Sequence, residues 1–91
     1  MKISFDPQKD LDNLQKHGIS LAAAEYLNWD SVFSSVDDRF DYGETRMIAY
    51  AYMLNRLYCV IFVDREDVRR IISLRKANNR EVLIYAANNY N

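Results

Sequence analysis

Several residue types are scarce in this 91-residue chain, and each scarcity removes a class of protein. A single cysteine allows no internal disulfide, so the chain is not a disulfide-stapled secreted module. With one proline, two glycines and 49% hydrophobic residues, the composition indicates an ordered globule, and this length predicts one domain over residues 1–91. No apolar run reaches membrane-spanning length, and the N-terminal MKISFDPQKD has no apolar core of a signal peptide. We therefore expect a cytoplasmic protein without a membrane partner.

The residues of metal and cofactor chemistry are equally few. One His and one Cys cannot form a cluster of soft metal ligands. Gly18 and Gly43 lie too far apart for a glycine-rich phosphate loop. A catalytic triad needs His17 beside Cys59 or a serine, but Cys59 lies within the hydrophobic stretch LYCVIFV, where packing explains it better. We expect no metal and no cofactor.

Charge is distributed unevenly along the chain although the net charge is only −1. Residues 1–45 carry four Lys or Arg against nine Asp or Glu, whereas residues 46–91 carry eight against four, and seven of those eight are Arg. Guanidinium groups bind phosphate through a planar fork, so the second half favours an anionic partner. The alternative is that the two halves neutralise each other within the fold.

The local patterns predict an α+β fold of the order β-α-α-β-β-β-α, an antiparallel twisted sheet packed against helices. Asp6 as N-cap, Pro7 at the first position and Gly18 past the end define a helix, on which Leu11 and Leu14 form a thin apolar stripe. Further helices are expected over residues 21–28, with Leu21, Ala24 and Leu27 on one face, and over residues 78–90, where Asn78 and Glu81 have capping-box spacing. Strands are expected over residues 2–5, 31–37, 46–54, 57–63 and 68–74, with a loop over residues 38–44 and a tight turn at Asn55-Arg56.

Strand alternation sorts the side chains of the predicted sheet into two faces. Arg46, Ile48, Tyr50 and Tyr52 share one face of their strand, and an Arg-Tyr surface can hold RNA by neutralising phosphate and stacking bases. The alternative is that these tyrosines line the edge of the core. In the last strand, alternation places Arg75 with Arg69, Ile71 and Ser73, and Arg70 with Ile72 and Leu74; without the register, either Arg70 or Arg75 can belong to the Arg46 face. Glu44 precedes Arg46 by two residues and is either a general base or a structural partner of an arginine.

Three segments carry a resemblance that covers nearly the whole chain: FDPQKDLDNLQKHGIS, DDRFDYGETR and RRIISLRKANNREVLIY. In their order and spacing they resemble the BrnT family, ribonuclease toxins of bacterial type II toxin–antitoxin modules with a RelE-like fold. The chain departs from the family pattern at Leu54-Asn55-Arg56, where a glycine is common, and at Val63-Asp64-Arg65, where the family often has an aromatic-Thr-x-Arg sequence.

The resemblance implies a metal-independent endoribonuclease that inhibits translation and growth. The ribose 2′-OH attacks the adjacent phosphate, so the site needs a base, an acid and cations around the phosphorane. We expect Arg46, Arg70 and Arg75 to stabilise the phosphorane, Glu44 or His17 to act as base, and Tyr85 to position the substrate or act as acid. Further substrate contacts are expected from Lys16, Tyr50, Tyr52, Lys76 and Arg80.

The resemblance also implies the partners, namely RNA and a BrnA-like antitoxin with a ribbon-helix-helix domain in a 2:2 complex, with operator DNA reached only through the antitoxin. Two other functions stay open at this point. A catalytically inactive module of the same fold would only bind an antitoxin or act as corepressor. A plain RNA-binding protein would have more Lys and a higher pI than 5.7.

Overall fold

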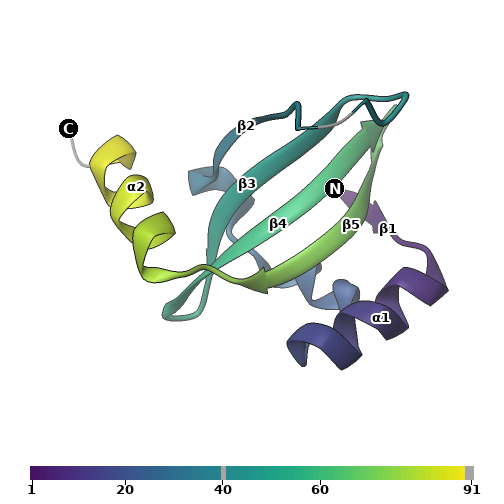
Figure 1. Ribbon diagram of the computed structural model, residues 1–91, viewed down its shortest axis with the longest axis horizontal. Helices are drawn as coiled ribbons and strands as arrows, with labels where there is room; N and C mark the ends of the chain where they lie inside the picture. Colours follow the sequence, from purple (N-terminus) through teal and green to yellow (C-terminus); the bar gives the residue numbers. More distant parts are fainter. Residues whose placement is uncertain (40, 90–91) are drawn as a thin grey trace.

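The computed structural model describes residues 1–39 and 41–89, which form a five-stranded sheet with helices packed on it (Figure 1). The strands are β1 (Lys2–Ser4), β2 (Phe33–Asp37), β3 (Arg46–Met53), β4 (Arg56–Arg65) and β5 (Val68–Lys76), in the sheet order β1-β5-β4-β3-β2. All neighbours are antiparallel except β1 and β5. The predicted α+β class is confirmed. The part of the chain that the structure describes has five strands, as the predicted strand ranges do, whereas the predicted order β-α-α-β-β-β-α counts four. Phe40, in the predicted loop, and Tyr90, the predicted end of the last helix, lie outside the described residues.

Helix α1 (Pro7–His17) begins and ends where the sequence predicts. The Asp6 carboxylate accepts a hydrogen bond from the Gln8 backbone N–H at 2.9 Å. Gly18 adopts a left-handed φ of 73°, and its N–H donates to the Leu14 carbonyl at 2.8 Å. These contacts satisfy terminal backbone groups that the helix itself cannot pair, so local chemistry alone sets both ends.

The apolar stripe predicted for α1 is wrong, because Leu11 and Leu14 are 60% and 48% exposed. A buried asparagine holds the helix to the sheet instead. The Asn13 amide donates to the carbonyls of Ile19 at 2.9 Å and Leu74 at 2.8 Å, and it accepts from the Leu74 N–H at 3.1 Å. Strand β1 covers only the first part of the β5 edge, so Asn13 takes the place of a neighbouring strand where β1 has ended.

The second predicted helix forms as a 3₁₀ helix, η1 (Leu21–Tyr26), followed by a shorter one, η2 (Trp29–Ser31). Its three core residues Leu21, Ala24 and Leu27 are buried, as the sequence predicts. They recur every three residues, which matches the three residues per turn of a 3₁₀ helix better than the α-helical period. The spacing therefore identifies the correct buried face, although the helix type differs.

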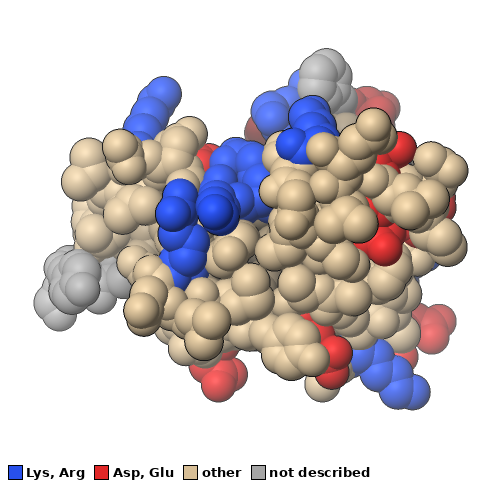
Figure 2. All heavy atoms as spheres, turned by 90° about the horizontal axis from the view of Figure 1, so that it is seen from below, with Lys and Arg blue, Asp and Glu red and all other residues tan. Residues whose placement is uncertain are grey.

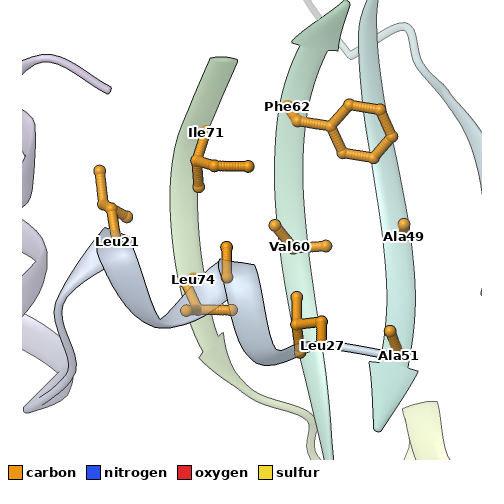
Figure 3. Close-up of a cluster of buried hydrophobic side chains, with 9 residues drawn as sticks. Leu21, Leu27, Ala49, Ala51, Val60, Phe62, Ile71 and Leu74 are labelled. Atoms are coloured by element: carbon orange, nitrogen blue, oxygen red, sulfur yellow. The ribbon is translucent and has the colours of Figure 1, made fainter. Parts of the chain in front are cut away.

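The main core lies between η1 and one face of the sheet (Figure 3). Small residues on β3 let η1 approach closely, and larger aliphatic and aromatic side chains on β4 and β5 fill the remaining space. The buried sheet residues are Ala49, Ala51, Val60, Phe62, Ile71 and Leu74. Because η1 covers this face, functional side chains must gather on the other face or at its edges.

The β3–β4 and β4–β5 hairpins close with two-residue turns. The first turn is Leu54-Asn55, one residue earlier than predicted, and Leu54 takes the left-handed φ of 55°. In the second turn, Glu66-Asp67, the left-handed residue is Glu66 at φ 57°. Side chains with a Cβ are disfavoured in this region, so both turns hold backbone strain that glycine would avoid.

A β-bulge interrupts the pairing of β4 with β5. Ile61 pairs with Ser73, but the next β4 residue, Phe62, pairs with Ile71, so Ile72 is left without a partner. An extra residue in one strand shifts the alternation of side chains beyond it by one position. Strict alternation along β5 therefore fails after Ile71.

The bulge decides which arginines share a face. Arg75 pairs with Cys59, which pairs with Tyr50, and Arg70 pairs with Val63, four residues along β4 from Cys59. Arg70 and Arg75 therefore both lie on the face that carries Arg46, although alternation predicted opposite faces. This surface, which we call the arginine face, carries Arg46, Ile48, Tyr50, Ile61, Arg70, Ser73 and Arg75 and lies opposite η1.

Candidate functional site

Helix α2 (Asn79–Asn89) packs against one end of the arginine face. Its predicted capping box is confirmed: the Glu81 N–H donates to Asn78 Oδ1, and the Asn78 N–H donates to Glu81 Oε1, both at 2.9 Å. Tyr85 packs with Leu57 and Ala77 beneath the helix. The other end of the arginine face stays partly exposed.

Arg75 is held by an ion pair beneath the start of α2. Its guanidinium donates to both Glu81 carboxylate oxygens, at 2.8 and 2.9 Å, and the Tyr50 hydroxyl donates to Glu81 Oε2 at 2.9 Å. The bond to Arg75, with further bonds from Asn78 and Tyr50, lowers the pKa of Glu81 to about 2. The same ion pair raises the pKa of Arg75, while burial and the bond to Glu81 raise that of Tyr50. The Arg75 side chain is therefore held in one orientation, and Glu81 largely neutralises its charge.

Arg46 and Arg70 differ from Arg75 because neither forms an ion pair with any described residue. The Arg46 Nε is buried without a hydrogen-bond partner, and its guanidinium carbon lies 3.9 Å from the centre of the Tyr42 ring. The register places both arginines beside Val63, about 10 Å apart across two strand spacings. Two uncompensated guanidinium groups this close form an anion-binding surface.

Figure 2 shows Lys and Arg atoms gathered in a depression beside the α2 end of the molecule. A separate pocket of about 190 Å³ lies between α1 and β5, with His17 and Ser73 among its lining residues. Partial burial, Lys16 and Arg75 together lower the pKa of His17 below its usual value. The imidazole is therefore mostly neutral at pH 7 and able to accept a proton.

Glu44 is paired with Arg65, an arginine with which the sequence pattern does not associate it. Strand β3 begins at Arg46, so Glu44 belongs to the preceding loop rather than to the strand. Its carboxylate accepts three hydrogen bonds from Arg65 at 3.0–3.2 Å. Of the two predicted bases, the structure brings His17 close to Arg75 and pairs Glu44 with Arg65.

The predicted tyrosines act mainly as packing residues in this arrangement. The Tyr85 hydroxyl donates to the Ser31 carbonyl at 2.7 Å, and the residue is 8% exposed. Tyr52 packs edge-to-face on Tyr85 with ring centres 5.4 Å apart, and the Tyr50 hydroxyl is bonded to Glu81. The rings of Tyr50 and Tyr52 therefore pack against Tyr85 and its neighbours at α2, and we do not expect them to stack on RNA bases.

The two remaining predicted contacts lie on the margin of the site. Lys76 pairs with Tyr58, which packs on the core, so it points away from the arginine face, and Arg80 is exposed at the start of α2. Sequence reasoning missed Lys9, Asp12 and Ser73, which line the pocket with Lys16 and His17. Lys9, Asp12, Lys16 and His17 recur at helical spacing along α1, and this spacing is the signal that could have found them.

A model of one protein family matches residues 5–81, which include the arginine face and the pocket. That family is described as the ribonuclease toxin BrnT of type II toxin–antitoxin systems. The chain belongs to the BrnT family. As a BrnT-family ribonuclease toxin it has a cognate antitoxin as partner. The search of curated proteins returned no match. In the described part of the chain, no helix is long and apolar enough to cross a membrane.

Proposed function

We propose that the chain is a metal-independent endoribonuclease that cuts RNA by attack of a ribose 2′-OH on the adjacent phosphorus, and that this activity inhibits translation and growth. The observation that carries the proposal is the pair of uncompensated cations, Arg46 and Arg70, on the face that also holds Arg75. A phosphorane carries more negative charge than the phosphodiester before it, so fixed guanidinium groups bind the transition state more tightly than the ground state.

The proton steps follow from the positions of the remaining groups. Neutral His17 takes the proton of the attacking 2′-OH, the 2′-oxygen forms a bond to phosphorus, and the bond to the 5′-oxygen breaks. The products are a 2′,3′-cyclic phosphate and a 5′-hydroxyl whose proton comes from solvent. Tyr85 is bonded to the Ser31 carbonyl, so we assign it to the support of α2 rather than to acid catalysis. Lys16 contacts the RNA backbone beside His17.

The test is cleavage of a short synthetic RNA by purified toxin. We expect cleavage to persist in EDTA and to stop when the nucleotide at the cut carries 2′-deoxyribose. Arg46→Ala should lower the rate about a hundredfold or more, because it removes one transition-state donor. The matched control is Arg56→Ala, which removes an exposed arginine at the β3–β4 hairpin and should change the rate less than threefold.

Three results would contradict the proposal: an unchanged rate for Arg46→Ala, loss of cleavage in EDTA, or cleavage of the deoxy substrate. Induction of the chain in bacteria without an antitoxin should arrest growth and degrade RNA. Intact RNA and normal growth would instead support the inactive, antitoxin-binding module.

For the partner, we propose a BrnA-like ribbon-helix-helix antitoxin that covers the arginine face in a 2:2 cytoplasmic complex. Acidic side chains on such a partner would neutralise Arg46 and Arg70, which have no counter-ion within the described chain. Binding at this surface should be competitive with RNA. Operator DNA would be contacted by the antitoxin, so the toxin alone should not shift operator DNA in a gel.

A further inference from the structure

The side of helix α1 next to β5 carries exposed charged side chains around the buried Asn13. Its pocket-lining residues follow the spacing i, i+3, i+4, i+7 and i+8, and they are Lys9, Asp12, Asn13, Lys16 and His17. Its two leucines, Leu11 and Leu14, point to solvent. The hydrogen bonds of Asn13 set this orientation of the helix. They leave the charged side chains exposed at the edge of β5, where they can contact a ligand.

The pocket beside these α1 residues is small, and its walls are held in place by α1 and β5. Asn13 is bonded to the Leu74 and Ile19 backbone, which fixes α1 over β5. Ile72, the extra residue of the bulge, supplies an apolar wall, and Ser73 supplies a hydroxyl. At about 190 Å³ the pocket is smaller than sites for drug-sized ligands, which begin at about 300 Å³, and suits one flat heterocycle.

The pocket adjoins the proposed scissile position. Ser73 lies on the arginine face between Arg70 and Arg75, so it borders both the pocket and the phosphate-binding surface. His17, the proposed base, lines the same pocket. A nucleotide whose phosphate rests on Arg70 can therefore place its base between α1 and β5, as single-stranded RNA does when its bases are splayed out and read on their edges.

The chemistry of the lining selects among the bases. Asp12 presents an acceptor-only carboxylate, held at one oxygen by a 3.2 Å hydrogen bond from the Gln8 side chain. Guanine alone offers two adjacent donors, N1–H and the N2 amino group, to such a carboxylate, and its O6 accepts from an ammonium such as that of Lys9, which also lines the pocket. Adenine and cytosine each present a ring acceptor beside their amino group, and uracil flanks its one N–H with carbonyls, so each would set an oxygen or nitrogen lone pair against Asp12.

We propose that the pocket between α1 and β5 binds a guanine next to the scissile phosphate, with Asp12 as the residue that specifies the base. This proposal rests on the proposed ribonuclease function. Asp12 is then a specificity residue that acts on the base and takes no part in the proton steps.

The test maps cut sites in an RNA pool of random sequence. Wild-type toxin should prefer guanine at one position beside the cut by about tenfold or more. Asp12→Asn replaces an acceptor by a donor and should reduce that preference to about twofold, through a loss of cleavage at the guanine sites. The control, Asp30→Asn, makes the same chemical change at an exposed residue outside the pocket and should keep the wild-type preference.

The outcomes separate the two proposals. A toxin that cuts without base preference, or an Asp12→Asn variant with the wild-type preference, would overturn the guanine pocket and leave the ribonuclease function standing. A toxin that does not cut would overturn the function first. An independent readout is NMR titration of wild-type toxin, in which guanosine 3′-monophosphate should shift the Ser73 and Lys16 amide signals at concentrations about tenfold lower than cytidine 3′-monophosphate. Equal shifts with both nucleotides would also overturn the pocket.

Discussion

The ion pair between Arg75 and Glu81 makes a prediction about stability that depends on pH. We expect Glu81→Gln to destabilise the fold at pH 7, because glutamine keeps the shape of the side chain but carries no charge. It therefore cannot form an ion pair with the Arg75 guanidinium. Holding the Glu81 pKa at about 2, against 4.5 in an unfolded chain, corresponds to at most about 3 kcal/mol. The Arg75 side chain is 35% exposed, and solvent screening reduces the expected loss to about 2 kcal/mol.

The sign of the pH dependence follows from the lowered pKa of Glu81. A carboxylate whose pKa is depressed by folding contributes its full stability above the unfolded value of 4.5 and loses it as the pH falls toward 2. Urea unfolding at pH 7, 5 and 3 should therefore show wild type and Glu81→Gln differing by about 2 kcal/mol at the two higher values and by about half that at pH 3.

A matched control separates this ion pair from ionic effects in general. Glu44→Gln removes the exposed pair with Arg65, in which the two side chains are 35% and 55% exposed, and should cost under about 0.5 kcal/mol at every pH. A Glu81→Gln deficit that is the same at pH 7 and pH 3 would refute the reasoning. It would mean that packing of α2, rather than charge, accounts for the loss.

Two further substitutions test the backbone of the site. Asn13→Ala should lower the free energy of unfolding by about 2–4 kcal/mol, because it leaves the Leu74 backbone groups buried without partners. The control Gln15→Ala, on the exposed side of α1, should change the free energy of unfolding by under about 0.5 kcal/mol. Equal effects of the two variants in urea unfolding would contradict the role of Asn13. Leu54→Gly should raise the free energy of unfolding by about 0.5–1 kcal/mol. Leu54 has a φ of 55° and is 95% exposed, so glycine removes the backbone strain without loss of packing. A lower urea midpoint for the variant would show that the turn is not strained.

Local chemistry in the sequence determined the ends of α1 and the buried face of η1. Asp6 and Gly18 end α1 because their backbone and side-chain preferences act over a few residues. Leu21, Ala24 and Leu27 are buried as predicted because hydrophobic spacing selects a face without knowledge of the rest of the fold. The sequence likewise singles out Arg46, Arg70 and Arg75 as candidate site residues, since Arg is the side chain suited to phosphate.

The tertiary structure decided how those residues meet. The bulge at Ile72 sets Arg70 and Arg75 on one face, and no local pattern encodes it, because a register shift depends on the partner strand. Asn13 turns α1 by bonding to Leu74, 61 residues away, so the leucines of the helix face outward and its charges line a pocket. Composition and short-range spacing thus fixed which side chains are available. How these side chains converge depends on hydrogen bonds between segments that are distant in the sequence. Such bonds form only in the folded chain, so local sequence patterns do not reveal them.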